Sequence, residues 1–247
     1  MVHLDQHYVD PRLVELYDLA NPRGADTDFY LRLAADLCAH TIVDFGCGTG
    51  LLTRELAIND RRIIGVDPAS AMLAIARRQP RADRVQWIEG DSSALGTPNA
   101  DLVVMTGNVA QVFLDDMEWA TTLHLIHAAL RPGGKLAFES RNPEAQPWVQ
   151  WTRDATYAKS DTPFGPLEEW LDGVTVHDGR VRFQGHNVFT ETGEVVLVPS
   201  ELRFRSRTEI TTSLMHAGFT VEQVYGDWHH GSLTSTSQVM VFIARRT

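Results

Sequence analysis

Cysteines and long apolar runs are scarce in this sequence, and their scarcity excludes several classes of protein. Among 247 residues there are two cysteines, Cys38 and Cys47, and neither has a Cys/His spacing typical of a metal site. We therefore expect no bound metal, and a reducing cytoplasmic compartment in which disulfides do not persist. No stretch approaches the roughly 18 apolar residues that a membrane helix needs, so we expect no membrane partner. Residues 1–10 lack the apolar core of a secretory signal.

Positive charge is also in short supply. The chain has 22 Lys and Arg against 32 Asp and Glu, which gives a formal net charge of −10. Such a surface repels phosphate backbones, so we expect no nucleic-acid partner. The length fits one large domain or one domain with a modest insertion, and we expect a monomer or a homodimer.

The apolar residues that are present switch repeatedly between strand-like and helix-like spacing. Strand-like runs at 41–45, 62–66, 85–88, 101–106 and 135–140 alternate with helical runs at 51–58, 69–78 and 115–130. This alternation predicts a parallel α/β sheet with helices on both faces. Two further helices, at 11–20 and 26–39, form a predicted N-terminal helical cap of residues 1–40.

The alternation stops between residues 145 and 206. Asp178-Gly179 is a strong two-residue hairpin signal, and Thr192-Gly193 marks a second turn. We therefore predict a small antiparallel β insert at 145–206, on the substrate side. A helix at 207–217 and strands at 219–225 and 238–244 then complete the sheet, so that residues 41–144 and 207–247 form one α/β domain.

The insert is rich in aromatic side chains. They are Trp148, Trp151, Tyr157, Phe164 and Trp170. Such a group forms either the wall of a pocket or a small core of the insert itself. Our hypothesis is that the insert is a lid that shapes an acceptor pocket.

Three polar segments follow three successive predicted strands. Val43-Asp44-Phe45-Gly46-Cys47-Gly48-Thr49-Gly50 follows the first, Gly65-Val66-Asp67-Pro68 ends the second, and Glu89-Gly90-Asp91-Ser92 ends the third. Glycines let a ligand approach the backbone, and ligands of open α/β sheets bind at the carboxyl ends of the strands. An acid after the second strand can accept hydrogen bonds from ribose hydroxyls. The pattern predicts a nucleotide-type site.

Together with Leu130-Arg131-Pro132-Gly133-Gly134, these segments resemble the class I S-adenosylmethionine-dependent methyltransferases. The resemblance covers most of the chain outside the insert. It implies a Rossmann-like, seven-stranded, mostly parallel sheet whose last strand is antiparallel. It also implies S-adenosylmethionine as the cofactor and S-adenosylhomocysteine as the product.

The resemblance further implies a role for individual residues. Gly46, Cys47, Gly48 and Gly50 would lie under the amino-acid part of the cofactor, Asp44 would orient its ammonium, and Asp67 with Pro68 would hold the ribose. Met72 would pack near the adenine, and Asp91 with Ser92 would read its edge. Thr106 and Asn108 would lie near the sulfonium, Phe113 would close that pocket, and Tyr17 or Tyr8 would cover the cofactor.

Transfer of a methyl group from a sulfonium is a single displacement that depends mainly on alignment. The acceptor would be an N, O or C atom of a small molecule, and only some acceptors need a base. Glu139 or Arg141, after the fifth strand, could contact the acceptor. An arginine such as Arg141 suits a carboxylate or phosphate. The alternative for Arg141 is a salt bridge that anchors the insert. His229 is a further weak candidate, whereas packing or exposed roles are favoured for His124, His127, His186 and His230.

Three other interpretations remain. A nicotinamide-dependent dehydrogenase would use Asp67, but its fingerprint is GxGxxG and the spacing here is GxGxG. An aminopropyltransferase of the same fold would need an acidic pair, and Asp115-Asp116 looks more like a helix N-terminus. A non-catalytic S-adenosylmethionine-binding module is the third. The chain has Thr106-Gly107-Asn108-Val109 where DNA and protein-glutamine amino-methyltransferases carry Asn/Asp-Pro-Pro-aromatic, which favours a small-molecule acceptor.

Overall fold

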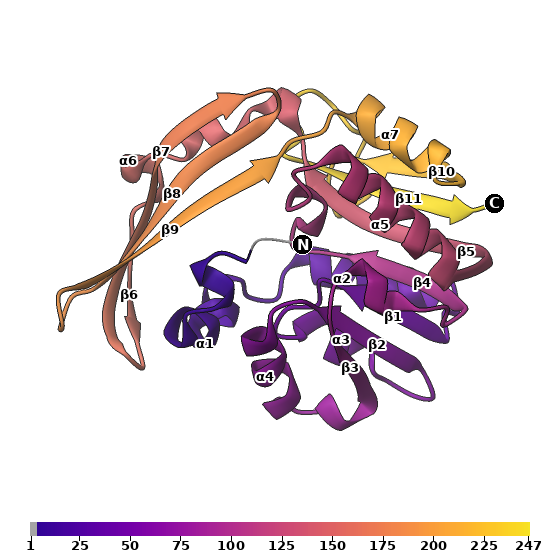
Figure 1. Cartoon of the computed structure of the whole chain (residues 1–247), viewed down its shortest axis with the longest axis horizontal. Helices are drawn as coiled ribbons and strands as arrows, with labels where there is room; N and C mark the ends of the chain where they lie inside the picture. The colour runs from indigo at the N-terminus through magenta and orange to yellow at the C-terminus, as the bar shows by residue number, and fades with distance from the viewer. Residues whose placement is uncertain (1–3) are drawn as a thin grey trace.

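A computed structural model describes residues 4–247 and contains two β-sheets, A and B (Figure 1). Sheet A comprises β1 (Thr41–Phe45), β2 (Arg62–Asp67), β3 (Val85–Glu89), β4 (Ala100–Met105), β5 (Leu130–Arg141), β10 (Phe219–Tyr225) and β11 (Val239–Arg246). Its spatial order is β10-β11-β5-β4-β1-β2-β3. Only β11 is antiparallel to its neighbours within this sheet. The predicted Rossmann-like sheet with an antiparallel last strand is confirmed.

The helices agree with the sequence pattern except at some of their ends. They are α1 (Pro11–Ala20), α2 (Ala25–Asp36), α3 (Leu51–Leu56), α4 (Ser70–Arg78), α5 (Asp116–Ala129), α6 (Arg153–Thr156) and α7 (Arg207–His216). The helix predicted at 26–39 ends at Asp36, because Cys38 turns to φ 48°. Cys38 N donates to Ala35 O and Ala39 N donates to Ala34 O, at 2.9 and 3.0 Å. These two bonds form a Schellman closure, which stops the helix.

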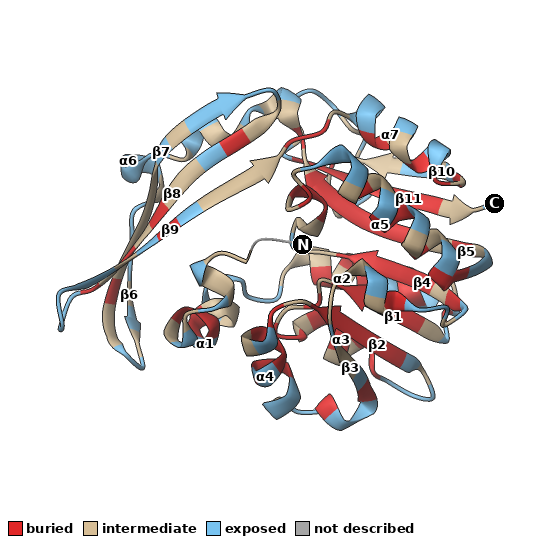
Figure 2. Ribbon diagram, viewed as in Figure 1, coloured by how far each residue is buried: buried red, intermediate tan, exposed pale blue. Residues whose placement is uncertain are grey.

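Sheet A is buried on both faces. On one face Trp119, Leu123 and Ile126 of α5 pack with strand residues such as Val103. On the other face α2 and α3 pack against the neighbouring residues of the same strand, Leu102 and Val104. Figure 2 shows the strands of this sheet largely buried. This two-sided burial explains why the strands read as nearly continuous apolar runs.

Sheet B is the predicted antiparallel insert. It contains β6 (Ala158–Thr162), β7 (Gly165–His177), β8 (Arg180–Phe189) and β9 (Glu194–Arg203), in that order. Asp178 and Gly179 adopt φ values of 50° and 70°, as the predicted two-residue hairpin requires. Gly193 (φ 72°) forms the second predicted turn. Much of sheet B is only partly buried (Figure 2).

Helix α1 connects the two sheets (Figure 1). Leu13 and Leu16 pack against Leu167, Phe189 and Val198 of sheet B. Val14, on another face of the same helix, packs with Met72 and Ile75 of α4. Helix α2, by contrast, lies on sheet A. The two helices predicted to form one N-terminal cap therefore have different partners, and the predicted domain boundaries stay a prediction.

Within residues 4–247, no helix is both long enough and apolar enough to cross a membrane.

Candidate active site

The glycine loop follows β1 at the carboxyl edge of sheet A. Gly46 N and Cys47 N donate to Val66 O at 2.8 and 3.1 Å, which fixes the loop to β2. Gly46 and Gly50 have positive φ, and a Cβ there would come within 2.4 Å of Val109 and Trp87 respectively. Gly48 (φ 54°) differs, since the nearest atom to its added Cβ is Met72 Cε at 3.4 Å. Two glycines thus permit close packing, whereas at Gly48 the positive φ, and not crowding, favours glycine.

Asp67, the last residue of β2, lies beside this loop. It is 7% exposed, and its two carboxylate oxygens accept Gly48 N and Ala69 N, each at 2.8 Å. Burial raises the pKa of Asp67, and these two hydrogen bonds oppose that rise. The bond from Ala69 N holds Asp67 just before the start of α4. Because a carboxylate can accept about four hydrogen bonds, Asp67 keeps capacity for two ribose hydroxyls.

Asp44 is a buried acid with one unpartnered oxygen. It is 1% exposed, and its Oδ2 accepts the Thr53 hydroxyl at 2.6 Å. Its Oδ1 has no hydrogen-bond partner among residues 4–247. Burial raises the pKa of Asp44 to about 7. A cationic donor would satisfy this oxygen and keep the carboxyl ionised, which fits the ammonium of S-adenosylmethionine.

The end of β3 supplies a third carboxylate. Asp91 Oδ1 accepts the Ser93 backbone N–H and hydroxyl at 2.9 and 2.7 Å, and these bonds lower the pKa of Asp91. Ser92 Oγ accepts the Thr122 hydroxyl at 3.1 Å. β1, β2 and β3 are parallel neighbours, so Asp44, Asp67 and Asp91 follow one another along the same edge. Their predicted contacts with the cofactor stay a prediction, as do those of Pro68 and Thr106.

Glu139 on β5 holds the loop after β4. Its Oε2 accepts the Tyr30 hydroxyl, and its Oε1 accepts Asn108 N at 3.0 Å. Glu139 is 3% exposed, and burial raises its pKa. Glu139 is therefore a buried acid that anchors Asn108, whose φ is 64°, to β5. Tyr30 was not foreseen, since its helix showed only ordinary apolar spacing.

Arg141 lies two residues further along β5, in a different environment. Its Nη1 donates to Gln111 Oε1 at 3.3 Å, and its guanidinium lies 5.5 Å from the centre of the Trp151 ring. It forms no ion pair with any described residue. The alternative of a salt bridge that anchors the insert is therefore wrong.

Tyr8 and Tyr17 lie together above the glycine loop. Their ring centres are 6.2 Å apart, and both pack with Met72 and Val14. Burial and nearby Asp67 raise the pKa of both, that of Tyr17 to about 12. Asp18, the next residue of α1, accepts the Thr49 hydroxyl, a contact that the sequence pattern did not reveal. Helix α1 is thus joined directly to the loop.

Phe113 was predicted to close the pocket near the sulfonium. It is 2% exposed and packs between Phe45 and Trp119, with ring centres 6.3 and 5.8 Å away. Phe113 is therefore part of the core under the loop. Its role as a pocket wall has no support in this packing.

The histidines considered as bases have other contacts. His229 is exposed, and only its backbone N–H donates to Asp227, at 2.7 Å, whereas the ring of His230 packs against Phe29 and Tyr225. His186 stacks on Trp170 at 4.6 Å and bonds Asp172, so it does not face solvent freely. The exposed position predicted for His229 and His230 is confirmed. No group of three or more metal-binding side chains exists in the part of the chain described.

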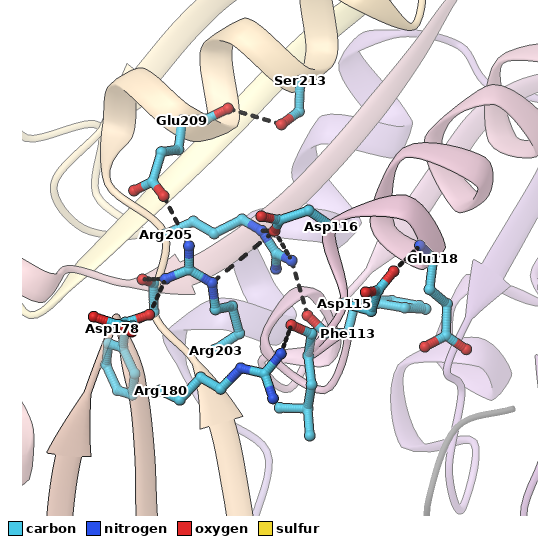
Figure 3. A network of polar contacts seen from close by, with 12 residues as sticks. Phe113, Asp115, Asp116, Glu118, Asp178, Arg180, Arg203, Arg205, Glu209 and Ser213 are labelled. Carbon is cyan, nitrogen blue, oxygen red and sulfur yellow. Dashed lines mark hydrogen bonds and ion pairs between the residues drawn. The ribbon is translucent and has the colours of Figure 1, made fainter.

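A surface recess of about 500 Å³ lies elsewhere, between the tip of the β7–β8 hairpin and the start of α5. Asp115 caps α5 by accepting Met117 N and Glu118 N. Asp116 accepts two hydrogen bonds from Arg205, at 2.8 and 3.2 Å (Figure 3). Asp115-Asp116 is therefore the predicted helix N-terminus, and the acid pair is committed to the fold.

Comparison with known proteins agrees with this geometry. A family model described as a methyltransferase domain matches residues 42–134, which run from β1 into β5. A cypemycin N-terminal methyltransferase from Streptomyces sp is 26% identical over 98% of this chain and 99% of that protein.

Two solved structures share the fold. One is an S-adenosylmethionine-dependent methyltransferase from Clostridium acetobutylicum, with a TM-score of 0.79, 16% identity and coverage of 94% of this chain and 96% of that one. The other is CalS10, an amino pentose methyltransferase from Micromonospora echinaspora, with a TM-score of 0.70, 20% identity and coverage of 94% and 97%. Residues 42–134 thus match a methyltransferase domain, and the chain has the fold of S-adenosylmethionine-dependent methyltransferases.

Proposed function

We propose that this enzyme transfers the methyl group of S-adenosylmethionine to the nitrogen of a small-molecule amine. The observation that carries the choice of nitrogen is the state of the side chains nearest the loop after β4. Glu139 is 3% exposed and holds Tyr30 and Asn108, and the rings of His186 and His230 pack against other aromatic side chains. A neutral amine needs no positioned base, whereas a phenol or an acidic carbon does. Two of the similar proteins are named for N-terminal and amino-sugar methylation.

The cofactor supplies an activated methyl group, and the chain's residues align it. Asp67 would hold the ribose hydroxyls through the free lone pairs of its two oxygens, already oriented by Gly48 N and Ala69 N. Asp44 Oδ1 would accept the ammonium. Alignment of this kind supplies roughly 7–11 kcal/mol toward such a displacement.

The acceptor would lie between the carboxyl edge of sheet A and the insert. Trp148 and Trp151 pack edge-on against Phe204 and Phe183, at 4.8 and 4.7 Å, so part of the predicted aromatic group is the insert's own core. Tyr157 and Phe164 remain 46% and 38% exposed. This division supports the lid hypothesis only for Trp151, which also touches Arg141.

The free cysteines Cys38 and Cys47 support a cytoplasmic location.

Titration calorimetry with S-adenosylhomocysteine tests the cofactor site. We expect S-adenosylhomocysteine to bind the wild type in preference to NAD and decarboxylated S-adenosylmethionine. Asp67→Ala should lose about 100-fold in affinity, since two charge-assisted hydrogen bonds are removed. The matched control is Asp101→Ala, because Asp101 also accepts two backbone N–H groups, His40 N and Thr41 N, at the opposite edge of the sheet. Unchanged affinity in Asp67→Ala would overturn the assignment.

Turnover on a panel of amines, phenols and carbon acids, followed by mass spectrometry, tests the acceptor atom. Methylated amines are the expected products. If methylated phenols were the only products, the acceptor atom would be oxygen and not nitrogen. Aminopropyl transfer from the decarboxylated donor, or binding without any turnover, would favour the aminopropyltransferase or the non-catalytic module.

A further inference from the structure

Arg141 is a partly buried cation that forms no ion pair within residues 4–247. Desolvation lowers its pKa, and no described carboxylate lies within ion-pair distance of its guanidinium. Glu139, two residues back on the strand, acts on it only at a distance, and its oxygens hold Tyr30 and Asn108. A guanidinium that is partly removed from water and has no ion-pair partner favours an anionic ligand.

Gln111 adds a second donor without an acceptor. It is 0% exposed, and its Oε1 accepts both Arg141 N and Arg141 Nη1 at 3.3 Å. These two bonds fix the orientation of the amide, because only the oxygen can face two donors. The Gln111 Nε2 that remains is buried and has no partner among residues 4–247. Arg141 and Gln111 thus present donors with no acceptor to match them.

The position of this pair relates it to the proposed acceptor site. β2, β1, β4 and β5 are consecutive neighbours in sheet A, so Arg141 lies about 14 Å along the carboxyl edge from Asp67. Tyr8 and Tyr17 lie between them, close enough for both charges to act on their pKa values. Trp151 of the insert covers the guanidinium from the other side. The donors therefore lie past the cofactor, at the junction of sheet A and the insert.

We propose that Arg141, supported by Gln111, binds an anionic oxygen group of the acceptor, a carboxylate or a phosphate, and so selects acidic acceptors. The proposal rests on the proposed function only in placing an acceptor here. A guanidinium forms two parallel hydrogen bonds with such a group. The acceptor is thus a molecule that carries both an amine and an acidic group.

Simple aromatic anions test the proposal without turnover. The protein is first loaded with S-adenosylhomocysteine and then titrated with benzoate, phenyl phosphate and neutral benzamide, by calorimetry and tryptophan fluorescence. We expect benzoate or phenyl phosphate to bind at least about tenfold more tightly than benzamide, as a charge-assisted pair requires. Which anion binds better identifies the acidic group.

Variants of Arg141 provide the critical comparison. Arg141→Gln should lose the preference for anions, and Arg141→Lys should keep only part of it, because Lys lacks the planar fork. The control is Arg153→Gln, since Arg153 also lies over a tryptophan, Trp170, at 4.3 Å. Equal binding of benzoate and benzamide by the wild type, no binding of either anion, or an anion preference retained in Arg141→Gln would each overturn the proposal.

The outcome is separable from that of the proposed function. Methyl transfer to amines without any advantage of acids over their amides would leave the proposed function intact and remove the anion site. An anion preference that depends on Arg141, with methylated phenols as the only products, would keep the anion site and reject nitrogen as the acceptor.

Discussion

At the residue scale, Asp44 illustrates a conflict between folding and ligand binding. Its carboxyl is buried, one oxygen has no partner in the described chain, and its pKa is raised to about 7. The unfolded chain would release that proton near pH 3.9. The folded protein without cofactor therefore favours the protonated form, and the ionised form is useful only when a cation arrives.

A first prediction concerns stability. Because the folded pKa of Asp44 is raised, its contribution to the free energy of unfolding is lost as the pH rises from about 4 to about 7. Asp44→Asn cannot ionise and can still accept the Thr53 hydroxyl. We expect it to be more stable than the wild type at pH 8, by about 2 kcal/mol, and by less at pH 5. Urea unfolding at both pH values measures this; a difference that does not grow with pH would contradict it.

A second prediction concerns the cofactor. Below pH 7 the proton on Asp44 must leave before the ammonium can be bound. Affinity for S-adenosylhomocysteine should therefore fall as the pH is lowered from 7, by up to about tenfold per pH unit. In Asp44→Asn the affinity should be weaker at pH 8 and should depend less on pH. Calorimetry between pH 5.5 and 8 tests this, and parallel pH profiles for the two proteins would reject the role of Asp44.

Some site residues could be predicted from sequence and others could not. Asp44, Gly48 and Asp67 could, because each lies at or just after the carboxyl end of a strand and the edge of a parallel sheet brings strand ends together. Tyr30 and Asp18 could not, because they reach Glu139 and Thr49 from helices whose docking depends on tertiary packing. The role of Phe113 stays a prediction, since an aromatic after a strand can face either the core or the ligand and Phe113 packs in the core.

At the element scale, helix α1 has contacts on three sides. It touches sheet B, α4 and the glycine loop through Leu13, Val14 and Asp18 respectively. Its limits at 11–20 could be predicted from periodicity and from the Asp10-Pro11 start, where Asp10 accepts Arg12 N at 2.9 Å. Its partners could not, because an amphipathic pattern shows which face is buried but not what covers it.

The contacts of α1 lead to a third prediction. Cofactor binding should reduce the opening of this helix, since Tyr17 and Asp18 lie against the loop that holds the ligand. Hydrogen exchange of residues 11–20 should slow on addition of S-adenosylhomocysteine, by about tenfold. Helix α7, which packs at the far end of sheet A, is the control and should change little. Equal protection in both helices would indicate only global stabilisation.

The joint between the insert and α5 leads to a fourth prediction. Arg205 is 3% exposed, donates to Phe113 O at 2.9 Å and lies 5.3 Å from the Trp119 ring centre (Figure 3). Arg205→Gln should lower the free energy of unfolding by about 2–4 kcal/mol, because a buried carbonyl loses its donor. Asp116→Asn should cost less than about 1 kcal/mol, since the Asp116 side chain is 73% exposed. If the two substitutions lowered the free energy of unfolding by similar amounts, the larger structural role assigned to Arg205 would be rejected.

At the scale of the whole molecule, helix α1 is the layer that sheet B shares with the α/β part. Leu13 and Leu16 of α1 complete the apolar cluster of sheet B, and Val14 completes that of α4. The parallel α/β sheet and the antiparallel insert could be predicted from the alternation of patterns and from the turn residues, and the antiparallel last strand from the resemblance. The junction between the sheets could not, because it is made by a helix more than 140 residues away in sequence from the strands that it covers.

This shared layer leads to a fifth prediction. Thermal unfolding should be a single transition. Trp148, Trp151 and Trp170 lie in the insert, whereas Trp87, Trp119 and Trp228 lie in the α/β part. Two variants are made, each of which keeps the tryptophans of only one part. The fluorescence of each variant should give the same unfolding midpoint as calorimetry. S-adenosylhomocysteine should raise the midpoint of both parts. Two midpoints, with only one raised by the ligand, would mean that the insert unfolds independently.

The position of α1 also bears on how acceptor preference is exchanged among related enzymes. The insert leaves and rejoins the α/β part at residues 145 and 206, which makes it an obvious segment to recombine. A chimera with a foreign insert alone, however, would set Leu13 and Leu16 against a surface that did not evolve with them. If the insert selects the acceptor, as proposed, the segment to exchange is discontinuous: residues 5–20 must be moved together with residues 145–206, and a library built from that pair of segments should yield folded hybrids where exchange of the insert alone does not.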